Sequence, residues 1–247
     1  LEQVLAEYFP GLAPVDLDLR KGFMGGEPGL DDPVFRQRLE QVWGMRAMNA
    51  NYGVSDVLCN FAGQCTFQND LHFLALDVVL PELVDPDSGQ RLPWEGGQEG
   101  ELVLTNLCKD CQPLLRFRTG DLVRLTATDV CACGRTAPRF RVIGRTDEMV
   151  VVRGVNAFPS SVAAAINQCA NLNGEYRVRL RHPSPYDRLP LEAELAQGTV
   201  PSEALARTLA RALGETLRLT VDLTLLASGT LPRTEGKTKR LIKEYEQ

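Results

Sequence analysis

The sequence has only two histidines, His72 and His182, among its 247 residues. A catalytic triad built on histidine is hard to assemble from them, because it needs an imidazole beside a nucleophile and His182 lies in the polar stretch RHPSPYD. Apolar runs of the roughly 18 residues that span a bilayer are also missing. The start LEQVLAEYFP lacks the basic residues and apolar middle of a signal peptide. We therefore expect a cytoplasmic protein with no membrane partner.

Basic residues are not in excess, since 27 lysines and arginines against 32 acidic residues give a formal net charge of -5. This balance gives no electrostatic reason to expect nucleic acid as a partner. Charged residues make up 24% and hydrophobic residues 44% of the chain, which is typical of a globular protein with a buried core. The length suits one large domain or two of ordinary size.

Cysteine, by contrast, occurs seven times. Without a secretion signal, these residues favour free thiols or a metal site over disulfides. Two closely spaced pairs stand out, Cys108 with Cys111 and Cys131 with Cys133. Their four thiolates suit a closed tetrahedral zinc site, which would hold loops together because no coordination position is left for water. Four unrelated thiols are the alternative, and Cys65 and His72 are substitute candidates for ligands.

Residues 116–160 combine strand-like runs, LVRL and MVVV, with polar turns. A carboxylate directly follows a turn in Thr119-Gly120-Asp121 and again in the stretch GRTD that ends at Asp147. Such a carboxylate can accept hydrogen bonds from the two hydroxyls of a ribose. Each aspartate could equally close its turn or cap its own backbone.

Two more polar turns precede this segment. Residues 22–29, GFMGGEPG, form a glycine-rich loop whose backbone could lie flat against a planar ligand, and Asp32-Pro33 then opens a helix through Trp43. No Walker lysine follows, so a phosphate-cradling loop is not predicted. In residues 51–56, NYGVSD, an aromatic ring could stack on a base, and a hydroxyl and a carboxylate could face phosphate and a hard cation. An ordinary strand-to-helix turn and a helix N-cap are the alternatives.

The rest of the chain reads largely as scaffold. Residues 71–107 have the pattern of a β-meander, and the residues after Gly154 predict a compact α+β unit with two helices. That unit ends in LPRTEGKTKR, residues 231–240. Lys237, which follows a glycine there, can act as a point charge toward phosphate oxygens. A basic tail that is merely solvated is the alternative.

Taken in order, GGEP, NYGVSD, RFRTGD, RVIGRTDEMVVVRGVNAFPS and LPRTEGKTKR resemble the motifs of the acyl-adenylate-forming superfamily, in particular its phenylacetate-CoA ligase branch. The resemblance covers nearly the whole chain. It implies a mixed fold, α/β and α+β: a β-rich remnant of the large AMP-binding domain over residues 1–145, then a small mobile α+β domain over residues 146–247. It also implies an acid-thiol ligase, in which a small and preferably aromatic carboxylic acid reacts with ATP to give acyl-AMP, and coenzyme A then displaces AMP.

The resemblance further implies roles for single residues. The nucleotide side would be formed by Gly26, Glu27, Pro28, Tyr52, Gly53, Ser55, Asp121 and Arg145. Among these, residues 26–28 would lie along the adenine and Asp121 would hold the ribose hydroxyls.

The resemblance also implies roles for four residues outside the nucleotide side. Asp56 would bind Mg²⁺, although the superfamily usually has the longer glutamate at that position. Asp147 would be the hinge of the small domain, and Gly154 would lie near the coenzyme A channel. Lys237 would bridge the carboxylate and the α-phosphate during adenylation.

One departure concerns the glycine- and serine/threonine-rich phosphate loop, which the superfamily carries upstream of GGEP and which this sequence does not contain. We therefore expect the chain to be inactive alone and to need an N-terminal half or a partner subunit. A truncated form, one subunit of a split enzyme and a degenerate protein all fit this departure. Two rival functions also stay open: an adenylating enzyme with a carrier protein or a cofactor hydroxyl as acceptor, and a non-catalytic, zinc-stabilised nucleotide-binding or interaction module.

Overall fold

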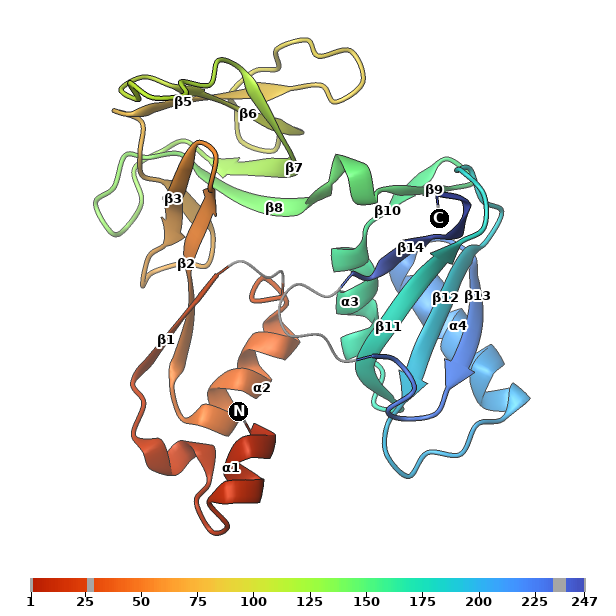
Figure 1. The fold of residues 1–247 in the computed structure, drawn as a ribbon. Helices are drawn as coiled ribbons and strands as arrows, with labels where there is room; N and C mark the ends of the chain where they lie inside the picture. Colours follow the sequence, from red (N-terminus) through yellow and green to blue (C-terminus); the bar gives the residue numbers. More distant parts are fainter. Residues whose placement is uncertain (1, 26–28, 233–238, 247) are drawn as a thin grey trace. The chain divides into compact units, whose positions relative to one another are not determined.

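The computed structural model describes residues 2–25, 29–232 and 239–246, and Figure 1 shows their course. The chain divides into two compact units, Leu1–Val142 and Ile143–Gln247, each with a hydrophobic core of its own. The domain division expected between residues 145 and 146 stays a prediction. Among the described helices, none has the length and apolar character needed to cross a bilayer.

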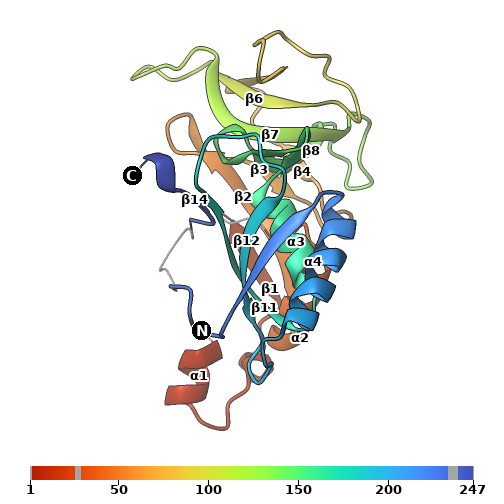
Figure 2. The ribbon, with the colours of Figure 1, turned by 90° about the vertical axis from the view of Figure 1, so that its right-hand side faces the viewer.

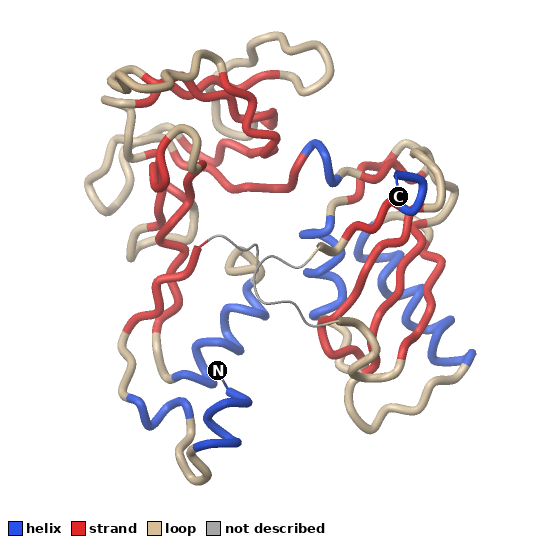
Figure 3. The backbone as a smooth tube through the Cα atoms, viewed as in Figure 1, coloured by secondary structure: helices blue, strands red, loops and turns tan. Residues whose placement is uncertain are grey.

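Strands dominate the first unit, as the colouring of Figure 3 makes plain. They are β1 (Lys21–Gly25), β2 (Arg46–Val54), β3 (Leu58–Gln64), β4 (Leu71–Phe73), β5 (Val79–Val84), β6 (Glu99–Asn106), β7 (Phe117–Ala127) and β8 (Arg139–Arg145), whose last residues belong to the second unit. They form one sheet in the order β1-β2-β3-β4-β8-β7-β6-β5. The β-meander predicted for residues 71–107 is wrong in one respect, because β4 pairs with β3 and β8 rather than with β5.

The core of this unit is aromatic at its centre. Phe61, Phe73 and Phe140 come from β3, β4 and β8 and are almost completely buried. The ring centroids of Phe61 and Phe73 lie 5.1 Å apart, and those of Phe73 and Phe140 lie 6.3 Å apart. Rings at these separations add a specific attraction to the burial of apolar area. The three strands are therefore held together at one point of the sheet.

The helices of the first unit are α1 (Glu2–Tyr8), the 3-10 turn η1 (Pro14–Leu17) and α2 (Pro33–Trp43). The predicted start of α2 is confirmed, since the carboxylate of Asp32 accepts a hydrogen bond from the backbone N–H of Val34 at 2.9 Å. Pro33 suits the first helical position because it has no N–H to leave unpaired there. The helix ends at Gly44, whose φ of +63° is left-handed.

The described residues of the second unit form a hairpin, two helices and a four-stranded sheet. Its elements are η2 (Thr146–Glu148), β9 (Val150–Val152), β10 (Val155–Ala157), α3 (Pro159–Asn167), β11 (Leu172–Leu180), β12 (Leu189–Leu195), α4 (Glu203–Leu217), β13 (Val221–Leu226), β14 (Leu241–Lys243) and η3 (Glu244–Glu246). The sheet order is β13-β12-β11-β14. Figure 2 shows α3 and α4 side by side, and they pack against β11 and β13.

Alternation along β11 explains which face of this sheet is covered. Tyr176, Val178 and Leu180 are buried, whereas the residues between them are half-exposed. On α4, Leu209 and Leu213 stand one helical turn apart and are buried in the same cluster. The strand period of two and the helix period of 3.6 thus meet in one core, as the sequence predicts for an α+β unit.

Candidate functional site

Tyr52 and Asp121 lie 69 residues apart in the sequence and meet in the structure. The hydroxyl of Tyr52, on β2, donates a hydrogen bond to Oδ2 of Asp121, on β7, over 2.7 Å. The Tyr52 ring is held edge-on against the rings of Phe61 and Phe140, with centroids 5.2 and 5.5 Å away. The aromatic core of the first unit therefore fixes the phenol that contacts this carboxylate.

A bulge in β7 sets the direction of Asp121. The pairing of β6 with β7 shifts register here, so that residues 119–121 stand opposite Leu102 alone. Gly120 has a φ of +76°, a conformation that glycine adopts without steric cost. The hydroxyl of Thr119 donates to the carbonyl oxygen of Leu102 at 2.7 Å and accepts from the backbone N–H of Asp121 at 3.0 Å. Bulges re-aim side chains out of the alternation of a strand, which is what a binding carboxylate at this place requires.

Glu101, which the sequence analysis missed, holds this bulge from the neighbouring strand. It is 1% exposed. Its carboxylate accepts the backbone N–H of Gly120 at 3.1 Å and pairs with the guanidinium of Arg118, whose Nε donates over 2.8 Å. A buried carboxylate needs such partners, because an uncompensated charge is costly in the interior. The signal in the sequence is a glutamate inside the apolar run GELVL.

The turn that follows Tyr52 is shaped by Gly53. The register between β2 and β3 shifts at this point, and a Cβ on Gly53 would lie 2.0 Å from the carbonyl oxygen of Cys59. Ser55 and Asp56 are exposed in the turn itself. The backbone carbonyl of Asp56 accepts a hydrogen bond from Nζ of Lys109 at 2.6 Å. The predicted contacts of these residues with nucleotide and Mg²⁺ stay predictions.

Replacing Gly53 by alanine should destabilise the first unit by about 1–3 kcal/mol, because the added methyl must displace the backbone of β3. Urea denaturation monitored by fluorescence measures this change. Gly96→Ala is a matched control, since a Cβ there would meet its nearest atom, the carbonyl oxygen of Thr126, at an ordinary 3.5 Å. Equal stability of the two variants would contradict the close approach at Gly53.

In the second unit, Arg145 and Asp147 form a two-pronged ion pair. Nε and Nη2 of Arg145 donate to Oδ1 and Oδ2 of Asp147 over 2.9 and 3.2 Å. Their side chains are 40% and 61% exposed, so the pair is screened by water and contributes little to stability. An exposed pair of this kind can exchange partners at low cost. The nucleotide contact of Arg145 and the hinge role of Asp147 stay predictions.

The residues before this pair are held by the segment that begins α3. The ring of Phe158 lies against Gly144, where a Cβ would come within 2.5 Å of a ring carbon. The hydroxyl of Ser160 donates to the carbonyl oxygen of Ile143 at 2.9 Å. Gly154 lies in the turn between β9 and β10, is exposed and has a φ of +80°. Its predicted place near a coenzyme A channel stays a prediction.

Four of the predicted site residues, Gly26, Glu27, Pro28 and Lys237, lie outside the described residues. The described residues on either side of positions 233–238 are well anchored.

The anchor on the N-terminal side is Glu194 of β12, which is completely buried. Its carboxylate accepts the backbone N–H groups of Gly229, at 2.9 Å, and of Leu231. On the C-terminal side, the guanidinium of Arg240 lies 4.9 Å from the ring centroid of Tyr176.

The predicted four-thiolate site is not assembled. Cys108 and Cys111 are exposed in the loop between β6 and β7, whereas Cys131 and Cys133 follow the other end of β7. β7 has 11 residues, and at about 3.3 Å per residue it separates its two ends by on the order of 35 Å. The predicted zinc site requires these two loops to be neighbours. Loops that precede and follow the same strand, however, lie at opposite ends of that strand. This corrects the ligand set.

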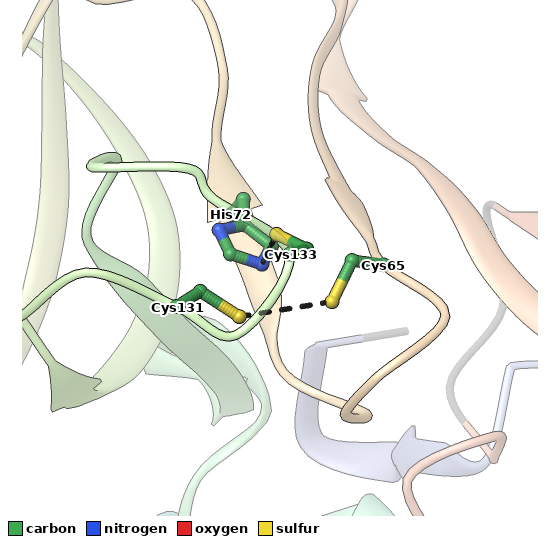
Figure 4. Close-up of side chains that lie close together, drawn as sticks. All are labelled: Cys65, His72, Cys131 and Cys133. Atoms are coloured by element: carbon green, nitrogen blue, oxygen red, sulfur yellow. Dashed lines mark hydrogen bonds between the residues drawn. The ribbon is translucent and has the colours of Figure 1, made fainter.

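Cys131 and Cys133 lie instead with Cys65 and His72, and Figure 4 shows the four side chains converging. Their ligand atoms are all within 4.8 Å of one another. Sγ of Cys65 is 3.9 Å from Sγ of Cys131, and Nε2 of His72 is 3.8 Å from Sγ of Cys133. His72 is 0% exposed and both Cys65 and Cys131 are 5% exposed. The two substitute candidates are thus the residues that join the second thiol pair.

The surroundings of this cluster favour the metal-binding protonation states of His72 and Cys133. Burial lowers the pKa of His72, although the backbone of Ala137 acts in the opposite direction, so the imidazole is neutral at pH 7. Burial raises the pKa of Cys133, but hydrogen bonds from the backbone and side chain of Arg135 and with the thiols of Cys131 and Cys65 together outweigh it and lower the pKa to about 7. A neutral imidazole and a thiolate are the forms that bind metal.

Comparisons with known proteins place this geometry in context. Residues 154–244 match the family model described as AMP-binding enzyme C-terminal domain. The chain is 33% identical to the phenylacetate-coenzyme A ligase of Thermus thermophilus, over 97% of this chain and 58% of that relative. It is 31% identical to the phenylacetate-coenzyme A ligase of Escherichia coli, over 91% of this chain and 51% of that relative. The chain thus spans about half the length of the curated relatives it matches.

A solved structure gives the same indication. A 2-hydroxyisobutyryl-CoA ligase in the postadenylation state, in complex with R3-HIB-AMP, is similar with a TM-score of 0.85 and 29% identity, over 99% of this chain and 52% of that one. This match confirms the expected mixed α/β fold class. Its likeness covers both the strand-rich part and the smaller C-terminal part of the chain. Together, these similarities confirm the resemblance that the order of the motifs indicated: the chain is similar to acyl-adenylate-forming enzymes of the phenylacetate-CoA ligase type.

Proposed function

We propose that this chain is the nucleotide-side portion of an AMP-forming acyl-CoA ligase. In the first half-reaction, a carboxylate oxygen attacks the α-phosphorus of ATP and pyrophosphate leaves. In the second, the thiol of coenzyme A attacks the acyl carbon, gives up its proton and expels AMP. The observation that carries the proposal is the meeting of Tyr52 and Asp121, because it joins an aromatic ring and a carboxylate at one place from two motifs far apart in the sequence.

The chemistry of this contact suits a nucleoside. An ionised carboxylate has about four lone-pair positions, so Asp121 can accept hydrogen bonds from ribose hydroxyls while it keeps the one from Tyr52. The Thr119 hydroxyl and the carboxylate of Glu101 hold the bulge before any ligand arrives. Such preorganisation lowers the entropy that binding must offset.

The other site residues are part of the proposal on the strength of their motifs. Gly26, Glu27 and Pro28 would lie along the adenine, Gly53 and Ser55 near the nucleotide, Asp56 on Mg²⁺, Arg145 and Asp147 at the hinge, and Gly154 beside coenzyme A. The exposed ion pair of Arg145 and Asp147 supports a hinge, because it can be remade as the small domain turns. Residues 1–145 and 146–247 would be the corresponding parts of the large and small domains.

Substrate and partners follow from the relatives. The curated relatives are phenylacetate ligases, which favours a small aromatic carboxylic acid. Since the chain spans about half of their length, we propose that an N-terminal half or a partner subunit supplies the phosphate loop and the remaining walls of the acyl pocket. We also propose that the protein is cytoplasmic.

Asp121→Ala should weaken AMP binding to the chain by roughly 10- to 100-fold, because hydrogen bonds to a charged group contribute about 1.5–3 kcal/mol. Titration calorimetry with AMP measures the loss, and circular dichroism checks that the variant is folded. Asp87→Ala, in an exposed turn, is the matched control and should bind as the parent chain does. Unchanged affinity in Asp121→Ala would count against the ribose contact.

The reaction itself is tested after the chain is joined to the N-terminal half of a phenylacetate-CoA ligase. Acid-dependent exchange of pyrophosphate into ATP is expected, followed by thioester formation when coenzyme A is added. Transfer to a carrier protein in place of coenzyme A would identify the rival acceptor. AMP binding without any exchange would instead indicate a non-catalytic nucleotide-binding module.

A further inference from the structure

The cluster of Cys65, His72, Cys131 and Cys133 has no part in the proposed reaction, and it is built entirely from the first unit. Cys65 directly follows β3, and His72 lies in the middle of β4. The two remaining cysteines come from the loop after β7, far along the chain. Three separate segments thus meet at one buried place: the first brings one thiol, the second brings the imidazole, and the third brings two thiols. The independence of these segments argues against a chance grouping of neighbours in the sequence.

Two of the six separations between the ligand atoms are close to the edges of a metal-centred tetrahedron, and all six are within 4.8 Å. With Zn–S near 2.3 Å and Zn–N near 2.0–2.1 Å, the edges are about 3.8 Å between two sulfurs and about 3.6 Å between sulfur and nitrogen. The distances of 3.9 Å between Cys65 and Cys131 and of 3.8 Å between His72 and Cys133 are close to these values. A disulfide would bring two sulfurs to about 2.05 Å. The cluster is therefore spaced for a shared cation.

The loop after β7 is folded so that both of its thiols face the same way. The backbone N–H of Gly134 donates to the carbonyl of Cys131 at 2.8 Å, and the N–H of Cys131 donates to the carbonyl of Arg135 at 2.9 Å. Gly134 has a φ of +85°, which permits this tight return of the chain. Nη1 of Arg135 donates to Sγ of Cys133 at 3.4 Å. This guanidinium can offset the net negative charge that three thiolates leave around a divalent cation.

Gln68 is another polar neighbour of the cluster. Its Nε2 lies 3.1 Å from Nε2 of His72 and 3.8 Å from Sγ of Cys65. The same amide nitrogen donates to the backbone carbonyl of Asp70 at 3.1 Å. The amide nitrogen of Gln68 therefore interacts with the same side-chain atoms that a cation would bind. The alternative to a metal site is a cluster held together by these hydrogen bonds without any metal.

We propose that Cys65, His72, Cys131 and Cys133 form a structural zinc site. Three thiolates and one imidazole give zinc four protein ligands, which closes the coordination sphere and leaves no position for a reacting water. The ion would tie the end of β3 and the middle of β4 to the loop between β7 and β8. That loop begins just after the strand that carries Asp121, so the ion would stabilise the sheet on which the nucleotide contact stands.

Metal analysis of the purified chain tests this site. About one zinc ion per chain is expected, and Cys131→Ser should reduce the zinc content to near zero. The double variant Cys108→Ser, Cys111→Ser is the matched control, because both of its thiols are exposed and outside the cluster, and it should keep its zinc. A folded, metal-free parent chain, or full zinc content in Cys131→Ser, would overturn the proposal.

Two further measurements keep the test decisive if Cys131→Ser fails to fold. Cobalt exchanged into the parent chain should give the visible spectrum of a tetrahedral thiolate site, and a chelator should lower Tm by several degrees in the parent chain.

Gln68→Ala should retain zinc if the metal, and not the amide, organises the cluster. His72→Cys should also retain it, because four thiolates still suit zinc. Absence of a thiolate-cobalt spectrum together with a Tm unaffected by chelator would refute the site.

Discussion

Lys237→Ala is expected to abolish acyl-AMP formation while thioester formation from supplied acyl-AMP stays largely intact. Attack of a carboxylate on the α-phosphate is opposed by charge repulsion, and a cation between the two stabilises the charge that builds in the transition state. Removing one preorganised electrostatic group of this kind costs about 3 kcal/mol or more, which is roughly 100- to 1,000-fold in rate. The role of Lys237 rests on its motif, because the residue lies outside the described ones.

The two half-reactions are measured separately in this chain joined to an N-terminal half. Pyrophosphate release reports adenylation, and consumption of a synthetic acyl-AMP by coenzyme A reports thioester formation. Lys239→Ala is the control, since Lys239 is an exposed lysine two positions further on. A loss of equal size in both half-reactions would refute the proposed role of Lys237, because the lysine is expected to be turned away during the second one.

Glu194→Ala should lower the free energy of unfolding of the second unit by about 3 kcal/mol or more, because each hydrogen bond to a charged group contributes about 1.5–3 kcal/mol. The Glu194 side chain accepts hydrogen bonds from Nδ2 of Asn173, at 2.7 Å, and from the backbone of Gly229 and Leu231. It is 0% exposed, so water cannot replace it. This is the largest effect on stability that we expect from any single substitution in the second unit.

Urea denaturation of the chain gives the change directly. Glu194→Gln keeps one acceptor oxygen and should lose less, whereas Glu203→Ala removes only an exposed ion pair and should be nearly neutral. Because Leu231 precedes the segment that contains Lys237, adenylation in the joined protein should also fall while AMP binding is retained. Equal stability of Glu194→Ala and Glu203→Ala would show that the hydrogen bonds of Glu194 do not stabilise the loop at Gly229 and Leu231.

The sequence was informative wherever a signal is local. Asp32-Pro33 marks the start of α2 because capping depends on two adjacent residues. The ordered motifs identified the relatives, and the comparisons confirm that assignment. The roles carried over from those motifs to Asp121, Asp147 and Lys237 are still predictions. Local spacing, however, suggested the wrong set of four thiols, since Cys65 and His72 are separated from Cys131 by a long stretch of chain.

The sequence by itself therefore determined which enzymes the chain resembles, the strand-rich and α+β character of the two parts and the candidate nucleotide carboxylate. Only the tertiary structure decided which groups meet: Tyr52 with Asp121, Glu101 with the bulge, and Cys65 and His72 with the second thiol pair. The physical reason is that caps and turns are set by interactions within a few residues. Strand order and register are set instead by which apolar faces pack together, and a shift of even one residue turns each side chain to the other face of the sheet.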